Sequence, residues 1–233
     1  MEKNDEFQLN QRRTFLKQFT TGAAVLGAGM FAAPLQSFAA EEQSSPDVSD
    51  ADTWFNKVKG KHRIVFDVPG PHEIFPFAWP KVFLLTNAKT GTPEKDCGVV
   101  VILRHNAIPY AMGNELWEKY KFGEMFKVTD PATKAPAVRN PFWQPKPGDF
   151  KIPGIGEVQI GINELQASGV MFCVCDMAIS VYSAVAAQGA SQDPATVKKE
   201  WIAGLLPGVQ PMPSGVWAVG RAQEHGCSYC FVG

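Results

Sequence analysis

The chain has 233 residues, of which 45% are hydrophobic and 19% are charged. Such proportions are ordinary for a globular protein with a sizeable buried core. The formal net charge at pH 7 is −1 and no block of like charge recurs. This composition argues against a nucleic-acid-binding protein and against a basic site for membrane surfaces.

The N-terminal segment has the three parts of an export signal. The pair Arg12-Arg13 precedes two apolar residues and a lysine, and residues 18–40 contain no charged side chain. Small residues at positions 37 and 39 form an A-x-A-like cleavage site. Residues 1–40 are therefore predicted to be a twin-arginine signal peptide, with Arg12 and Arg13 as the transport signal that sends the folded protein to the periplasm.

The alternative for this segment is an uncleaved membrane anchor, because the uncharged stretch is long enough to span a bilayer. Gly22, Gly27, Gly29 and Pro34 make it a poor permanent helix, which favours the export signal. After removal of the signal, no association with a membrane is expected.

Residues 41–60 are predicted to be a linker and residues 61–233 the mature domain, in which short apolar runs alternate with helical patterns. Strands are predicted at 63–68, 98–103, 169–175, 209–212 and 227–232, and helices from about Pro80, along 108–120, and at 176–189, 194–206 and 215–226. The alternation predicts an α/β fold with a mainly parallel sheet of about five strands flanked by helices.

Residues 121–156 interrupt this pattern, since they contain six prolines and no sustained period. A long stretch without regular structure is uncommon inside a compact domain, so the segment is predicted to be a Pro-rich insertion. Two roles fit it equally. It either wraps the surface and pins Phe142 and Trp143 onto the body, or it acts as a lid.

Polar groups follow several of the predicted strands. Asp67 lies near the end of the first, Arg104-His105-Asn106 follows the second, and Ser214 follows the fourth. Open parallel sheets bind ligands at the carboxyl ends of their strands. Arg104, Asn106 and Ser214, with Arg139 of the insertion, are therefore candidate ligand-binding residues. His105 is either a candidate catalytic residue or a structural histidine.

Cys175 is the candidate nucleophile. It ends a buried strand and precedes a helix that Asp176 is predicted to cap. Amide groups and the macrodipole at a helix start favour negative charge, and this favours a thiolate over a thiol. The alternative is a buried cysteine that acts only as a small apolar residue.

The chain has five cysteines. Cys227 and Cys230 form one C-x-x-C, which is weak support for a zinc site because no second ligand pair is present. A disulfide among Cys227, Cys230 and Cys97, or plain burial, fits better, and Cys173 is expected to remain a thiol. No metal site is predicted. Nucleotide, zinc-protease and haem motifs are missing, so the sequence names no cofactor.

Four segments together resemble the DsrE/DsrF-like proteins: 169–178, 205–209, 213–216 and 221–229. The resemblance implies a compact parallel-sheet fold that oligomerises, and an exported branch of the family for this chain. The best understood members relay sulfur as a cysteine persulfide, and the relay cysteine follows the buried strand, as Cys175 does here. Those members are small and cytoplasmic, whereas this chain is larger and carries the Pro-rich insertion.

Three hypotheses for function follow. In the first, the protein is a periplasmic persulfide carrier that uses Cys175, with positive charge from His105 or Arg104 and with a sulfur-transfer protein as partner. In the second, Arg104, His105 and Arg139 bind an anion or small ligand without covalent chemistry. In the third, the domain is an interaction module. A homo-oligomer is expected from the family resemblance.

Overall fold

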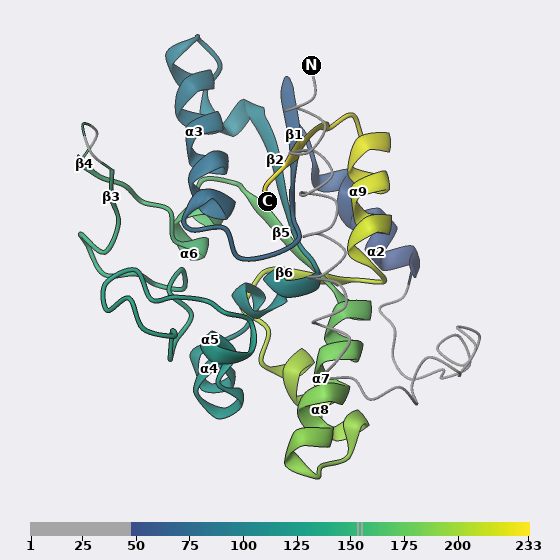
Figure 1. The fold of residues 1–233 in the computed structure, drawn as a ribbon. Helices are drawn as coiled ribbons and strands as arrows, with labels where there is room; N and C mark the ends of the chain where they lie inside the picture. Colours follow the sequence, from purple (N-terminus) through teal and green to yellow (C-terminus); the bar gives the residue numbers. More distant parts are fainter. Residues whose placement is uncertain (1–47, 153, 155) are drawn as a thin grey trace, which may run out of the picture. The chain divides into compact units, whose positions relative to one another are not determined.

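The computed structural model describes residues 48–152, 154 and 156–233. The predicted signal peptide, with Arg12 and Arg13, and the first part of the linker lie outside these residues. For the rest of the linker the prediction is wrong, because residues 48–57 are helical and Ala51, Trp54 and Phe55 are buried in the core. Five parallel strands form one sheet in the order β6-β5-β2-β1-β7 (Figure 1). The strands are β1 (His62–Val68), β2 (Cys97–Leu103), β5 (Met171–Cys175), β6 (Val209–Met212) and β7 (Ser228–Phe231).

Helices flank both faces of this sheet, which confirms the predicted α/β class. One face carries α2 (Val48–Trp54), η3 (Phe55–Lys57) and α9 (Gly215–Glu224), and the other carries α3 (Phe75–Lys89) and α6 (Ile162–Ala167) (Figure 1). Beyond the end of β5, α7 (Asp176–Ala190) packs on α8 (Pro194–Ala203). The short elements are η4 (Glu94–Asp96), η5 (His105–Ala111), α4 (Asn114–Tyr120), α5 (Phe122–Met125), β3 (Lys151–Ile152) and β4 (Gly156–Glu157).

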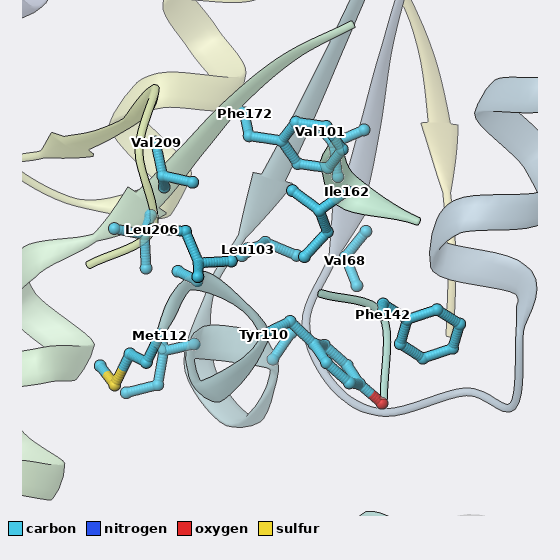
Figure 2. Packing of buried hydrophobic residues seen from close by; sticks show 14 of the residues in the cluster. Val68, Val101, Leu103, Tyr110, Met112, Phe142, Ile162, Phe172, Leu206 and Val209 are labelled. Carbon is cyan, nitrogen blue, oxygen red and sulfur yellow. The ribbon is translucent and has the colours of Figure 1, made fainter. Parts of the chain in front are cut away.

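The centre of the sheet divides the core into two layers. Every residue of β2 is buried, as its unbroken apolar run predicts for a central parallel strand. Val101 and Leu103 pack in the larger cluster, which Figure 2 shows together with Phe172 of β5. Ile102 points to the opposite face and packs in the smaller cluster beneath α9.

The helix predicted from about Pro80 begins earlier than expected. α3 runs from Phe75 through Pro80, which lies inside it. A proline removes one helical hydrogen bond and is costly there. Burial of Phe77, Pro80 and Leu84 against the sheet compensates for that loss, so packing overrides the local preference.

The helical spacing along 108–120 also breaks. Residues 105–111 form the 3-10 helix η5, and α4 starts only at Asn114. Met112 lies between them in an extended conformation and forms an isolated bridge with Leu205. Other helix ends shift by a few residues: α7 ends at Ala190 rather than Gly189, α8 at Ala203 rather than Leu206, and α9 at Glu224 rather than Gly226.

The Pro-rich insertion at 121–156 packs into the core over its described residues. Phe142 is 2% exposed and stacks between Phe77 of α3 and Phe150, with ring centroids 4.1 and 4.9 Å apart. Buried Asn140 donates to the carbonyl oxygens of Tyr110 and Met112 at 2.8 and 3.1 Å. These contacts favour the surface wrap over the lid, with Phe142 as the pinning side chain.

Among the described helices, none is both long and apolar enough to cross a membrane.

Candidate functional site

The carboxyl ends of the parallel strands bring several of the predicted residues to one edge. Leu103 of β2 is paired with Val174 of β5, and Cys175 is paired with Met212 of β6. Arg104 and Cys175 are the next residues along their strands, so the register places them at neighbouring positions. The edge is thus the meeting point of groups that are far apart in the sequence.

Cys175, rather than Asp176, caps α7. Its sulfur accepts a hydrogen bond from the backbone N–H of Ala178 at 3.3 Å, and Asp176 is the first residue of the helix. The prediction that Asp176 is the cap is therefore wrong. The cap position suits Cys175 because its extended backbone turns the side chain back over the first helical N–H groups.

Asp176 has a different role, since it is 5% exposed and accepts from Lys198 Nζ of α8 at 3.0 Å through Oδ2. Its other carboxylate oxygen has no hydrogen-bond partner among the described residues. The ion pair ties the start of α7, and with it Cys175, to α8.

Arg104 is held beside Cys175 in a partly buried network in which only Asp67 is fully buried. Its Nε and Nη2 donate to the two carboxylate oxygens of Asp67 at 2.6 and 2.9 Å, and the hydroxyl of Tyr229 donates to Asp67 Oδ2 at 2.7 Å. The hydrogen bond to Asp67 raises the pKa of Arg104, and the neighbouring Tyr229 and Cys175 raise it further. Arg104 is therefore a permanent cation at this edge.

The start of α9 covers the stem of Arg104. Ser214 is the cap of α9, and its hydroxyl accepts from the N–H of Trp217 at 3.2 Å. A Cβ on Gly215 would lie 2.4 Å from the Cβ of Arg104, so only glycine allows this close approach. Ser214 therefore lies at the site, but its hydroxyl is already used for capping.

His105 and Asn106 form a second group with Tyr182 of α7. The Tyr182 hydroxyl donates to Asn106 Oδ1 and lies 3.4 Å from Nδ1 of His105. Burial lowers the pKa of His105, and the charge of Arg104 lowers it further. His105 also has a φ of 49°, a left-handed conformation that is uncommon for residues other than glycine. The contacts of its ring are thus with Tyr182 rather than with Cys175.

Arg139 does not join these groups. It pairs with Asp149 at 3.4 Å within the Pro-rich insertion. It also lines a pocket of about 580 Å³ whose other walls come from α4, α5 and residues 136–138. None of the strand-end residues lines that pocket, so the predicted grouping of Arg139 with Arg104 and His105 is wrong.

All five cysteines are free thiols. Cys97 begins β2, whereas Cys230 lies in β7, and both strands pair with β1 on opposite sides. Two strand spacings alone amount to about 10 Å, and Cys97 pairs with His62 whereas Cys230 pairs with Phe66, four residues further along β1. Cys227 lies just before β7 and is likewise two strands away from Cys97. Both separations are beyond the reach of a disulfide. Cys227 packs in the smaller core cluster and Cys230 against the larger one, so they face opposite sides of the sheet. The predicted disulfide does not fit this fold within one chain.

Burial governs the thiol chemistry of the other cysteines. It raises the pKa of Cys173, which is fully buried, and raises the pKa of Cys227 to about 11. Cys97 and Cys230 also have pKa values raised by burial. A thiol whose pKa is raised is a poor nucleophile, so these four cysteines are poor candidates for the site. Cys175 is buried to the same degree as Cys97 and Cys227, at 7% exposure against 8% and 6%, and differs from them in the helix-start N–H that its sulfur accepts. Within the described part of the chain, no group of three or more His, Cys, Asp or Glu residues could hold a metal ion.

Two site residues were missed by the sequence analysis. Tyr229 lies inside the C-x-x-C and gave no signal of its own, and Tyr182 lies seven residues beyond Cys175 on α7. Asp67 carried one recognisable signal, as the only carboxylate in an otherwise apolar stretch of β1. Its partners could not be read from the sequence because they lie 37 and 162 residues away.

Comparisons with known proteins are sparse. Neither a scan against protein-family models nor a search of curated proteins gives a match. One similar solved structure is a protein of unknown function from Methanobacterium thermoautotrophicum, with 16% identity, a TM-score of 0.38, and coverage of 74% of this chain and 100% of that one.

Proposed function

We propose that the protein is a DsrE-like sulfur carrier that holds a persulfide on Cys175. One observation supports this above the others: the sulfur of Cys175 caps a 15-residue helix beside a fixed arginine. The N–H of Ala178 donates to this sulfur, and Arg104 is the neighbouring cation. Groups of both kinds bind anions. A thiolate is the attacking species, and a persulfide is also an anion, so the same groups serve both states.

The transfer step is an exchange at sulfur. The thiolate of Cys175 attacks the outer sulfur of a donor persulfide, R–S–SH. A new S–S bond forms, the old one breaks, and the electron pair and the proton leave as R–SH. Cys175 then carries one extra sulfur atom, and delivery to an acceptor thiol is the same step in reverse. No external oxidant or reductant is consumed.

The positive charge in this scheme belongs to Arg104 rather than to His105. A lowered pKa keeps the imidazole of His105 mostly neutral near pH 7, whereas the guanidinium is always charged. The ring contact with Tyr182 gives His105 a supporting role in shaping the loop after β2.

Export completes the proposal. The Arg12-Arg13 pair and the uncharged segment after it indicate a periplasmic protein that crosses the membrane already folded. In that compartment a sulfur-transfer protein is the expected partner for both loading and delivery.

The test is to incubate the reduced mature protein with a low-molecular-weight persulfide and to locate added sulfur by mass spectrometry. One sulfur atom, 32 mass units, is expected on Cys175. Cys175→Ser should abolish loading, whereas the matched variant Cys227→Ser should load normally. Alkylation of Cys175 only after unfolding would identify it as a core residue and would overturn the proposal.

An interaction module is the second candidate, and one surface favours it. Met177, Val181 and Val185 form a stripe along α7 with exposed fractions of 46, 43 and 36%. The only charged residue of α7 is Asp176, which is buried and paired with Lys198. The stripe can therefore pack against the same stripe of a second copy without repulsion between like charges, and this supports a homo-oligomer.

A further inference from the structure

Arg104 and Tyr229 both bind the carboxylate of Asp67, so the network contains one more donor than a simple ion pair. Asp67 is 3% exposed and accepts three hydrogen bonds, two from Arg104 and one from Tyr229. Those three bonds come from Arg104, the residue that follows β2, and from Tyr229 of β7, and these two strands lie on either side of β1. The carboxylate is thus clamped from both sides, and the plane of the guanidinium is fixed with it.

The clamp leaves one edge of Arg104 available. Nε and Nη2 are both directed at Asp67. Nη1 has no hydrogen-bond partner in the part of the chain that the structure describes. The side chain of Arg104 is 25% exposed, and its stem is covered by Gly215. The N–H groups of Nη1 are therefore available to donate hydrogen bonds to a ligand, on a guanidinium whose orientation Asp67 fixes.

Tyr229 is well suited to hold such a clamp. Desolvation at its hydroxyl, together with the hydrogen bond to Asp67, raises the pKa of Tyr229 to about 12, so the phenol keeps its proton and remains a donor. The residue is 45% exposed and lies on the edge strand β7, so its ring contributes little to the core. The hydroxyl bond to Asp67 is the main specific contact that the side chain makes.

From this geometry we infer that Asp67 and Tyr229 are positioning residues, which fix Arg104 so that the site at Cys175 selects small anionic sulfur donors. The inference rests on the proposed persulfide chemistry. The chemical class is a sulfane-sulfur anion such as thiosulfate. The thiolate of Cys175 attacks the outer sulfur of thiosulfate, the S–S bond of the donor breaks, and its electron pair leaves on sulfite. Cys175 is left as the persulfide anion, and Arg104 balances the charge of the donor.

The charge preference can be measured without any sulfur donor. Iodoacetate is an anion and iodoacetamide is neutral, and both alkylate thiolates. The quantity to measure is the rate of alkylation of Cys175 by iodoacetate divided by its rate with iodoacetamide, both at one fixed pH. Tandem mass spectrometry distinguishes modification of Cys175 from modification of Cys173. The ratio in the wild-type protein should exceed that of N-acetylcysteine amide. Arg104→Gln should lower it roughly tenfold, as expected for removing one charge at close range.

Variants of the clamp then separate position from charge. Tyr229→Phe removes one hydrogen bond and no charge, and it should lower the ratio about two- to threefold, because a single hydrogen bond has a modest net worth. Asp67→Glu keeps the charge but displaces the carboxylate by one methylene, and it should lower the ratio as well. Arg104→Lys should restore part of the loss seen in Arg104→Gln.

The matched control is Arg221→Gln. Arg221 lies in the last turn of α9, pairs with Asp52 and Glu224, and is six residues beyond Gly215. Its loss removes the same charge about 9 Å further along the helix and should leave the ratio unchanged. The thermal unfolding midpoint of each variant shows whether it is folded. If Asp67→Glu does not fold, the test rests on Tyr229→Phe.

Loading with thiosulfate distinguishes the two proposals. If Cys175 gains sulfur but the alkylation ratio is the same in wild type, Arg104→Gln and Tyr229→Phe, then the positioning inference is overturned and the carrier function stands. If the ratio falls as expected but no donor ever loads Cys175, the carrier function fails and the anion selectivity stands. With both intact, Tyr229→Phe should raise the thiosulfate concentration needed for half-maximal loading by two- to threefold and leave the maximal rate unchanged.

Discussion

Phe77 and Phe142 stack with ring centroids 4.1 Å apart, and this contact joins α3 to the Pro-rich insertion. In the sequence, the rest of α3 and the whole of η4, β2, η5, α4 and α5 lie between the two residues. Because both rings are buried, the insertion is part of the core at this point rather than a cover laid over it.

Phe142→Ala should therefore lower the free energy of unfolding by about 3–4 kcal/mol, the usual loss for a large aromatic side chain in a core. Urea denaturation measures it. Val138→Ala, in the same segment but with an exposed fraction of 74%, should change the free energy by less than about 0.5 kcal/mol. Equal, small effects of both substitutions would show that the segment is a detachable lid.

His105 should make the protein less stable in mild acid. Folding lowers the pKa of His105. As the pH falls below about 6.5, the imidazole is therefore protonated in the unfolded chain before it is protonated in the folded chain. Stability is then lost as the pH falls through the unfolded value. His105→Asn should remove this part of the loss and still fold, because asparagine tolerates a positive φ. Urea midpoints at pH 7.5 and 5.5 measure it, and an unchanged drop in the variant would contradict the assignment.

Export should depend on the arginine pair. Changing Arg12 and Arg13 together to lysine keeps the charge but removes the transport signal. The full-length precursor should then collect in the cytoplasm, as seen by cell fractionation and immunoblotting. A change of Lys17 to arginine is the control and should leave export normal. Unaltered periplasmic levels in the double variant would exclude the twin-arginine route.

Assembly should depend on the apolar stripe of α7. Val181→Glu places a charge in the middle of the stripe and should convert an oligomer to a monomer, because an unpaired charge is costly to bury at an interface. Sedimentation velocity at micromolar concentration reports the mass. Val138→Glu adds the same charge at the more exposed position in the Pro-rich insertion and should leave assembly intact. A wild-type mass equal to one mature chain would contradict the interaction surface.

Much of the fold could be predicted because its signals are local. The unbroken apolar run of β2 indicated a central strand, and it is buried along its whole length. Asp193 and Ser214 directly precede the predicted helices at 194–206 and 215–226 and are of residue types that favour the cap position, and each accepts a hydrogen bond from the N–H three residues later. Such signals act within one helical turn or one strand, which is the range over which a sequence can be interpreted directly.

The candidate site was predictable only in part. Arg104, Cys175 and Ser214 follow strands and so could be expected at one edge of a parallel sheet. Arg139 was misplaced because its position depends on how the Pro-rich insertion folds back, for which the sequence has no local signal. His105 follows a strand as well, but its ring turns toward Tyr182.

The sequence by itself determined the five strands of the sheet, the starts of α7, α8 and α9, and the edge at which polar groups would gather. Only the tertiary structure decided that α3 continues through Pro80, that Phe142 belongs to the core, and that Asp67 holds Arg104 with the help of Tyr229. The physical reason is the same in each case: the energy comes from contacts between residues that are remote in the chain, and these exist only once the sheet has set its register.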